Sequence, residues 1–291
     1  MSEASSQLPG NLSATRRRQL GTASARSTLL TVLGEFVHPC GESVWTATLL
    51  EALVALDIEE KSARQALTRT ANEGILASER HGRRVLWTLT EHGTTLLEQG
   101  TERIYGFMRS RPRWDGSWLV LSVPIPESQR QLRHRLRTRL TWLGLGSPTS
   151  GLWISPDTGH APDVHAVIRE LGLEDLAFAW SGPASGIGSE PRLLADAWNL
   201  DEVEARYLEF LDEFEDREAS DDRAAYVAQV QMVEAWRRFP FLDPALPSEL
   251  LDHDWPGARA ADTFHDRHAR WHRPARAAWE TFEAAGGPKP A

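Results

Sequence analysis

Residues 58–89 read IEEKSARQALTRTANEGILASERHGRRVLWTL, and this stretch decides the fold of the first third of the chain. Small and apolar side chains recur in its first half at helical spacing, at Ala63, Ala66, Leu67 and Thr70. This spacing predicts a helix with one face in a core, ending at Gly74. The second half predicts strands over 75–80 and 84–89 around a glycine-containing turn at 81–83. A helix followed directly by a basic hairpin is typical of a winged helix-turn-helix DNA-binding domain.

The outward face of this helix carries residue types that contact phosphates and base edges. They are Lys61, Ser62, Arg64, Gln65, Thr68 and Arg69. Arginine can bind O6 and N7 of guanine, and glutamine N6 and N7 of adenine, with two hydrogen bonds each. We therefore expect Ser62, Arg64, Gln65 and Arg69 to point into the major groove. Lys61 and the hairpin residues Arg80, Arg83 and Arg84 are better suited to phosphates or the minor groove.

The same pattern has two other interpretations. Arginine and glutamine on an outward helix face often form only a solvated surface, and winged helices also serve as protein-binding modules. A protein-binding module predicts no salt-dependent affinity for DNA.

Flanking segments complete the predicted winged-helix domain over residues 27–113. An apolar helical period covers 28–37, and a second helix runs to Ala55 with Thr46 as its N-cap. After the hairpin, a further helix starts at Thr90 and leads out of the domain to Arg109. Residues 1–26 lack apolar periodicity, which predicts a flexible tail. Its residues 16–18 are three arginines that either lie against DNA or remain solvated.

The middle of the chain, residues 114–181, predicts a ferredoxin-like α+β domain after a hinge at 110–118. Strands are expected at 118–123, 151–154 and 176–181, and helices at 128–143 and 163–171. Strand and helix alternate over about sixty residues, as in split βαβ folds. The segment GLGSPTSG lacks the residues of a phosphate-binding loop, so we interpret it as a turn.

The last part, residues 192–291, predicts a helical carboxy-terminal domain after a connector at 182–191. Helical patterns cover 193–218, 221–238 and 258–285. The chain as a whole is therefore expected to be a multidomain α+β protein.

Charge is unevenly distributed along the 291 residues. The net charge is −9, but residues 1–113 carry 14 basic against 12 acidic side chains, whereas 181–291 carry 12 against 22. The predicted DNA-binding part is thus slightly basic, and its local field matters more for DNA than the total. A single cysteine excludes a disulfide framework and a cysteine-rich zinc site. No apolar run is long enough to span a membrane, which predicts a cytoplasmic location.

Three groups of strings carry a family resemblance. They are ARQALTRTANEGIL with HGRRVLWTLTEHG, WDGSWLVLSVPIPE with GLGSPTSGLWISP, and RRFPFLDPALPSELLDHDWPG. In this order they resemble the PaaX family of bacterial transcriptional repressors. The resemblance implies a winged helix, a middle domain similar to the CRISPR-associated Cas2 nuclease fold, and a helical carboxy-terminal domain. It also implies a homodimer that represses an aromatic-compound (phenylacetate-type) catabolic operon. An aryl-CoA thioester such as phenylacetyl-CoA would release it from its double-stranded operator DNA, and the protein would be no enzyme and hold no cofactor.

A CoA thioester needs cationic side chains at one end of its site and apolar side chains at the other. Arg133 and Arg137 share a face of the predicted helix 128–143, and Trp153 is expected nearby; Arg237 and Arg238 are alternative phosphate partners. A solvated basic face, or one that meets the acidic carboxy-terminal part, would give the same arginine pattern.

A metal-dependent enzyme that processes nucleic acid is the alternative from another class. A Cas2-like nuclease would use Asp115 or Asp157, but such catalysis needs several carboxylates that converge on the ion. Asp262 and the histidines His265, His268 and His272 also fall near one face of a predicted helix. Their spacing alone is weak support for a metal site, and we expect none.

Overall fold

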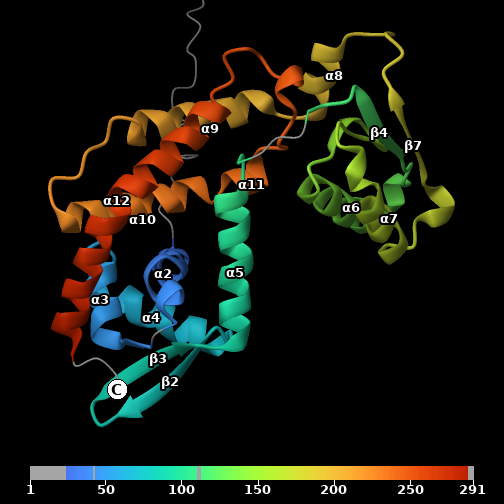
Figure 1. Ribbon diagram of the computed structural model, residues 1–291. Coiled ribbons are helices and arrows are strands. Elements are labelled where there is room, and N and C mark those ends of the chain that lie inside the picture. Colours follow the sequence, from blue (N-terminus) through green and yellow to red (C-terminus); the bar gives the residue numbers. More distant parts are fainter. Residues whose placement is uncertain (1–23, 42, 110–112, 288–291) are drawn as a thin grey trace, which may run out of the picture. The chain divides into compact units, whose positions relative to one another are not determined.

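The computed structural model describes residues 24–41, 43–109 and 113–287, which form two compact units. Unit 1 contains the described residues up to Leu97 together with 221–230 and those from Pro274 onward. Unit 2 contains 98–220 and 231–273. Figure 1 labels most of the helices and strands of both units. The arginines at 16–18 and nearly all of the predicted tail lie outside the described residues.

The helices of unit 1 follow the predicted pattern closely. α2 (Ala25–Val32) continues through a π-helical turn (Leu33–Val37) and a short 3-10 turn (His38–Cys40). α2 begins three residues before the predicted start, because the hydroxyl of Ser24 accepts a hydrogen bond from the backbone N–H of Ser27 and caps it. α3 (Thr46–Val54) and α4 (Glu60–Asn72) are the other two helices that the sequence predicts before the hairpin.

Thr46 is not the N-cap of α3, contrary to the prediction. Trp45 occupies the N-cap position without a side-chain cap. The Thr46 hydroxyl instead donates to the carbonyl of Val85 at 3.1 Å and accepts from the indole N–H of Trp87 at 2.8 Å. Thr46 therefore connects the start of α3 to the hairpin, because its hydroxyl bonds to residues of β3 and not to backbone N–H groups of α3.

The predicted hairpin is confirmed. β2 (Leu76–His81) and β3 (Arg84–Leu89) pair antiparallel, and β1 (Val44–Trp45) adds to β3 to give the order β1-β3-β2. His81 pairs with Arg84, which leaves a two-residue turn whose first residue, Gly82, has a φ of 63°. Glycine at this position suits the primed turns that match strand twist. The hairpin extends beyond the helices of the unit (Figure 1).

Two segments from far along the chain complete the core of unit 1. They belong to α10 (Asp222–Trp236) and α12 (Gly257–Gly286), whose remaining residues lie in unit 2. The ring of Phe36 stacks on Trp279 with centroids 5.4 Å apart and lies 5.1 Å from Tyr226. The fully buried Tyr226 hydroxyl donates to the carbonyl of Ala52 at 3.2 Å, and burial raises the pKa of this hydroxyl. The winged helix is thus packed against helices encoded some 200 residues later.

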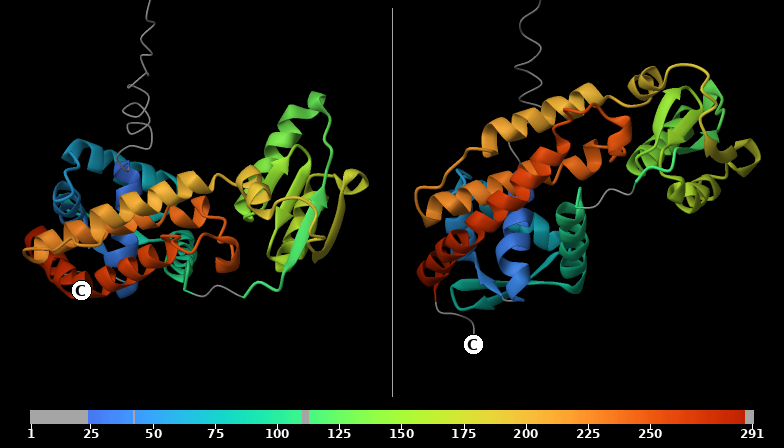
Figure 2. Two further views of the ribbon diagram at one scale, coloured as in Figure 1. Left: turned by 90° about the horizontal axis from the view of Figure 1, so that it is seen from above. Right: turned by 45° about the horizontal axis from the view of Figure 1, so that its top comes forward.

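Unit 2 contains the ferredoxin-like domain that the sequence predicts. Its chain order is β4 (Ser117–Ser122), α6 (Arg130–Trp142), β5 (Gly146–Thr149), β6 (Leu152–Ser155), α7 (Ala161–Glu170) and β7 (Phe178–Pro183). The sheet is antiparallel with the order β5-β6-β4-β7. α6 and α7 cover one face of it (Figure 2).

β5 is a strand that the sequence analysis missed, since GLGSPTSG was interpreted as a turn. Its residues GSPT include glycine, serine and proline, which are poor strand formers. β5 lies at the edge of the sheet, where Pro148 need not donate to a ladder. The prediction of three strands was therefore wrong by one strand.

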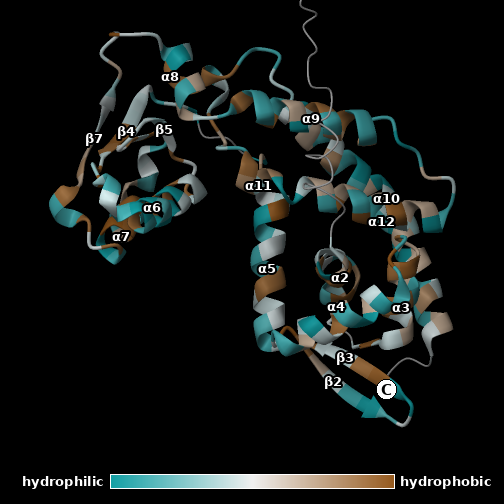
Figure 3. Ribbon diagram, turned by 180° about the vertical axis from the view of Figure 1, so that it is seen from behind, coloured by the Kyte–Doolittle hydropathy of each residue, from teal (hydrophilic) through white to brown (hydrophobic). Residues whose placement is uncertain are grey.

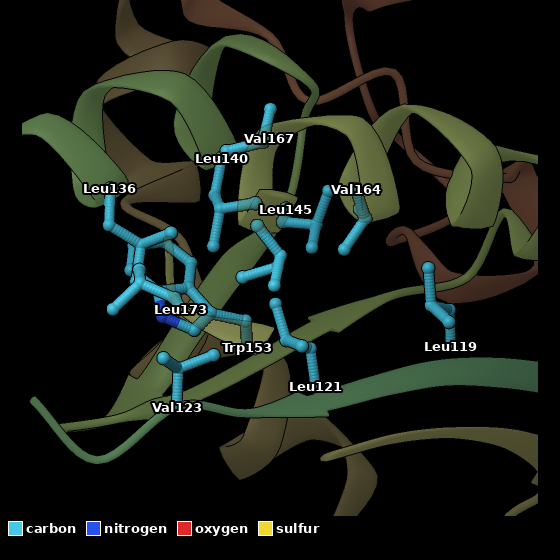
Figure 4. Close-up of a cluster of buried hydrophobic side chains, with 11 residues drawn as sticks. Leu119, Leu121, Val123, Leu136, Leu140, Leu145, Trp153, Val164, Val167 and Leu173 are labelled. Carbon is cyan, nitrogen blue, oxygen red and sulfur yellow. The ribbon is translucent and has the colours of Figure 1, made fainter. Parts of the chain in front are cut away.

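The sheet separates two apolar clusters. Leu119, Leu121 and Trp153 face α6 and α7, where they meet Leu136 and Leu140 in the cluster that Figure 4 shows. On the other face, the buried side chains of Trp118 and Ile154 pack against three leucines of the later chain, at 194, 246 and 250. Both faces of the central strands β4 and β6 are thus buried, which explains their nearly continuous apolar sequence.

The remaining helices of unit 2 surround an aromatic core. The helix predicted over 193–218 is two helices, α8 (Glu190–Ala197) and α9 (Leu200–Phe214), and α11 (Phe239–Leu242) follows α10 after a short break. Tyr207 stacks on Phe239 with ring centroids 4.2 Å apart, and its hydroxyl donates to Asp243 at 2.6 Å. No helix of the described part is long and apolar enough to cross a membrane.

Candidate functional sites

The outward face of α4 is polar, as predicted. Ala63, Ala66, Leu67 and Thr70 are buried, whereas Lys61, Arg64, Gln65, Thr68 and Arg69 are exposed and Ser62 is half-buried. The Thr70 hydroxyl donates to the carbonyl of Ala66 at 2.8 Å and is thereby satisfied inside the core. Small residues on the inner side let α4 lie close to its neighbours, so that its long polar side chains point to solvent.

Among the described residues, three of these five exposed side chains have no hydrogen-bond or ion-pair partner. Arg64 and Thr68 are the exceptions: Nε and Nη2 of Arg64 donate to Oε1 of Glu60 at 2.9 and 2.6 Å, and the hydroxyl of Thr68 donates to the carbonyl of Arg64 at 3.0 Å. Among the described residues, no carboxylate pairs with Lys61 or Arg69, and no side chain bonds to Gln65. Their charges and hydrogen-bonding groups are therefore available to a ligand outside the chain.

The hairpin presents a second set of cations beside α4. Arg80, Arg83 and Arg84 are exposed, and Figure 3 shows hydrophilic residues at its tip. Glu79 and His81 pair at 3.2 Å on β2. Arg84 also lies against the end of α12: a Cβ placed on Gly287 would be only 2.5 Å from Nη1 of Arg84. Arg80 and Arg83 are thus the hairpin arginines without such a neighbour in the described part.

An ion pair connects the end of α4 to the first helix. The guanidinium of Arg26 donates through Nε to Oε2 of Glu73 at 2.8 Å, and its Nη2 contacts the same oxygen. Gly74, at φ 74°, then reverses the chain toward the hairpin. These contacts fix the direction in which α4 presents its polar face.

Unit 2 contains a cavity of about 860 Å³, which is the second candidate site. Its lining comes from α6 and β5–β6, from α8 and α9, and from the segment 242–255. Arg137 and Trp153, both predicted as ligand-binding residues, line it together with Thr141 and Ser147. The guanidinium carbon of Arg137 lies 5.9 Å from the centroid of the Trp153 ring.

Trp198 forms a fixed part of the cavity wall. Its indole N–H donates to the carbonyl of Gly144 at 3.1 Å. The ring lies flat against Gly146, because a Cβ on Gly146 would be 2.4 Å from its Cε2 atom. Nothing in the sequence around Trp198 indicates that this residue lines a cavity.

Carboxylates dominate the charge around this cavity. The acidic lining residues are Glu190, Asp196, Asp201, Glu202, Glu204, Glu249 and Asp252, against two arginines, Arg137 and Arg206. Arg206 pairs with Glu209 at 2.9 Å. The excess of acid in residues 181–291 was the only sequence signal for this feature.

The other predicted ligand-binding arginines are not in the cavity lining that the structure describes. Arg133 donates to Glu127 at 2.8 Å, and its guanidinium lowers the pKa of that carboxyl by hydrogen bonding and by its charge. Nη1 of Arg237 lies 3.5 Å from Oε1 of Glu234, and the next residue, Arg238, is exposed. Arg133, Arg237 and Arg238 therefore do not meet Arg137 in one site.

The side chains weighed above as metal ligands make other contacts. His268 bonds through Nε2 to the hydroxyl of Tyr105 at 2.9 Å, and burial lowers the pKa of His265. Asp115 and Asp157 each accept from a backbone N–H two residues on, at 2.8 Å, and so stabilise turns. Within the described ranges, no three His, Cys, Asp or Glu side chains gather as metal ligands would.

Comparisons with known proteins match all three parts of the chain. Residues 24–93 match the PaaX-like protein family, 111–194 the central Cas2-like domain of PaaX proteins, and 198–281 the carboxy-terminal domain of PaaX-like proteins. The transcriptional repressor PaaX of Escherichia coli K12 is 29% identical over 249 residues, which cover 81% of this chain and 77% of that protein. An uncharacterized protein, Rv0674 of Mycobacterium tuberculosis, has a similar structure, with a TM-score of 0.61 and 25% identity over 89% of this chain and 100% of that one. With its three parts matched in order, the chain belongs to the PaaX-like family of transcriptional repressors.

Proposed function

We propose that this protein is a cytoplasmic, dimeric repressor that binds double-stranded operator DNA of an aromatic-compound catabolic operon of the phenylacetate type. The observation that carries the proposal is the face of α4, where Lys61, Gln65 and Arg69 have no partner among the described residues. Beside it, the hairpin exposes Arg80 and Arg83. This combination suits a helix in the major groove with phosphate contacts from the hairpin.

A homodimer would let two such helices read a two-fold symmetric site. The edge strand β7 supports a self-association surface, because Phe178 and Trp180 on one of its faces are 68% and 55% exposed. No charged residue lies between Asp175 and Glu190 to protect this edge. Trp180→Glu is therefore expected to shift the protein from dimer to monomer in sedimentation experiments, whereas Glu174→Gln leaves the dimer unchanged.

The effector that we propose is an aryl-CoA thioester such as phenylacetyl-CoA, bound in the cavity of unit 2. Arg137 provides one polar group and the half-buried indole of Trp198 one aromatic wall for such a ligand. Binding would release the protein from its operator.

The proposal is tested by a DNA titration with the full chain on the region upstream of its own gene. Specific binding that weakens with salt, and that phenylacetyl-CoA reverses, is the expected result. Specific binding that ignores the thioester would keep the repressor and discard this effector. A chelator should leave DNA binding unchanged. A nucleic-acid-processing activity that is lost on addition of chelator would favour the metal-dependent enzyme.

A further inference from the structure

The cavity of unit 2 combines an aromatic interior with an acidic border. Trp153 is only 5% exposed, and Trp198 is held in place by Gly144 and Gly146. The lining also holds seven carboxylates against two arginines; Arg206 is paired with Glu209 at 2.9 Å, and Asp196 with Arg192 at 3.6 Å. Arg137 is the lining cation that forms no ion pair with the described residues.

This charge pattern is the reverse of what a phosphate-binding site needs. Phosphates are bound by arginine, lysine or helix amino termini, whose charges or dipoles oppose their own. In a border with net negative charge, the phosphates of a coenzyme would be repelled, and the repulsion would be strongest at low ionic strength. The nucleotide end of a CoA thioester is therefore a poor match for the cavity.

The other end of the same molecule matches well. The pantetheine arm is uncharged and carries amide N–H groups and a hydroxyl, which carboxylates accept as hydrogen-bond donors. An aryl group can pack against the half-buried indole of Trp198, whereas Trp153, at 5% exposure, lies under Arg137. Arg137, across the Trp153 ring, can donate to the thioester carbonyl.

We infer that the cavity binds the acyl-pantetheine end of the effector and keeps the nucleotide phosphates outside, so that the phosphates weaken binding. The inference rests on the proposed function, because it assumes that a CoA thioester is the effector. The inference covers a broader class of ligands than the proposed function does, since any neutral aryl-pantetheine thioester should bind. The protein then recognises the pantetheine arm and the acyl group of the thioester. Free CoA, which lacks the acyl group and carries the phosphates, competes poorly with it.

Calorimetric titration of the full chain with three compounds tests this inference. The compounds are phenylacetyl-CoA, phenylacetyl-pantetheine and CoA itself. We expect the pantetheine ester to bind at least as tightly as the CoA ester at low salt. Raising salt from about 20 to about 200 mM should tighten binding of the CoA ester several-fold by screening the repulsion, and should leave the pantetheine ester unchanged. Weakening of the CoA ester by salt, or displacement of it by free CoA, would overturn the inference.

Variants assign the effect to the cavity. Neutralising two exposed lining carboxylates in Glu249→Gln with Asp252→Asn should tighten CoA-ester binding roughly three- to tenfold at low salt and leave the pantetheine ester unchanged. Glu174→Gln, an exposed carboxylate of the same unit outside the lining, is the matched control. Trp198→Phe and Arg137→Gln should weaken both esters, and a circular dichroism melt confirms that each variant folds. Equal behaviour of the double variant and the control would contradict the inference.

The outcomes separate this inference from the proposed function. If phenylacetyl-CoA releases DNA but salt weakens its binding, the repressor and its effector stand and the orientation in the cavity is wrong. If neither ester binds and DNA binding is unaffected by both, the effector proposal fails and the inference fails with it. DNA binding itself, measured without thioester, depends on neither result.

Discussion

α4 and α6 are both helices of 13 residues with arginines on their outer faces, yet they use these arginines differently. On α6, Arg133 and Arg139 pair with Glu127 and Glu170 at 2.8 and 2.7 Å, and Arg137 lies over Trp153. On α4, Lys61 and Arg69 pair with no carboxylate of the described residues. Of the five arginines of α6, two form ion pairs with described residues and a third lies over Trp153, whereas on α4 the paired arginine is Arg64, with Glu60.

Under the proposed function, in which α4 contacts DNA, the number of basic residues is a poor guide to the DNA-binding helix. Side chains that are already paired would have to lose a partner before they could contact DNA, which offsets part of the gain. Unpaired side chains on a small-residue helix incur no such cost. The following predictions test this contrast between α4 and α6.

The largest effects are expected from the buried leucines of the two helices. Leu67 and Leu140 are 1% and 0% exposed. Leu67→Ala and Leu140→Ala should each lower the free energy of unfolding by about 2–5 kcal/mol, because each leaves a cavity. Chemical denaturation followed by tryptophan fluorescence measures the loss, with Thr138→Ala on the exposed face of α6 as control. A loss under 1 kcal/mol at either leucine would contradict the packing described.

Substitutions on α4 should reduce discrimination between DNA sequences, whereas a substitution on α6 should leave it unchanged. Gln65→Ala and Arg69→Ala should each reduce discrimination between operator and mutated operator by about 1–3 kcal/mol, since each removes a hydrogen-bonding group from a base edge. Arg135→Ala, an exposed arginine of α6, is the matched control. Fluorescence anisotropy titrations with both DNA sequences give the ratio of their dissociation constants. Comparable losses for Arg135→Ala and Arg69→Ala would remove the distinction between the helices.

Phosphate contacts should appear as a change in salt dependence. Arg83→Ala is expected to weaken binding to all sequences alike and to reduce the slope of log affinity against log salt by about one. Arg130→Ala on α6 removes the same charge and should leave the slope unchanged. A smaller slope for both variants would show that α6 also lies along the DNA.

The exposed ion pairs of α6 should contribute little. Arg139 and Glu170 are each about half exposed, at 49% and 51%. A double-mutant cycle with Arg139→Ala and Glu170→Ala should give a coupling of at most about 1 kcal/mol, because solvent screens the pair. A coupling several times larger would mean that the pair is effectively buried.

The smallest effect concerns the ionisation of Glu127. The hydrogen bond and charge of Arg133 lower the pKa of this carboxyl below its ordinary value of 4.5. Because the folded-state pKa is the lower one, the stabilisation is present above the unfolded pKa and disappears as pH falls through the folded pKa. NMR titration should give a midpoint that returns toward the ordinary value in Arg133→Gln. An identical midpoint in the wild type and this variant would place Arg133 elsewhere in solution.

Local patterns made α4 and its hairpin predictable. The four inward residues of α4 keep one helical period, and Gly74 and Gly82 mark the turns on either side of β2. The ferredoxin-like order of helices and strands was also predictable, apart from β5. Its residues Gly146 to Thr149 favour a turn, and only the neighbouring β6 and the overlying Trp198 make them a strand.

The cavity could not have been derived from sequence patterns. Its walls come from segments near 137–153, 190–206 and 242–255, and no periodicity connects residues so far apart. Arg137 and Trp153 were predicted from the needs of the ligand, whereas Trp198 and the acidic border were missed. The contact of Phe36 with Tyr226 and Trp279 escaped prediction for the same reason, since its partners lie about 190 and 240 residues away.

The packing of Phe36 against Tyr226 and Trp279 also bears on how the protein is made. During translation, the winged helix emerges from the ribosome long before the helices that cover it. Its core stays incomplete until residue 282, whose ring lies 5.1 Å from Tyr226, has been added. In a prematurely terminated chain, α4 would therefore lie in a unit 1 with an incomplete core. Such a chain should compete poorly with the full-length protein for operator DNA. For the same reason, moving the winged helix between relatives as a folded domain requires moving three separate pieces of chain together.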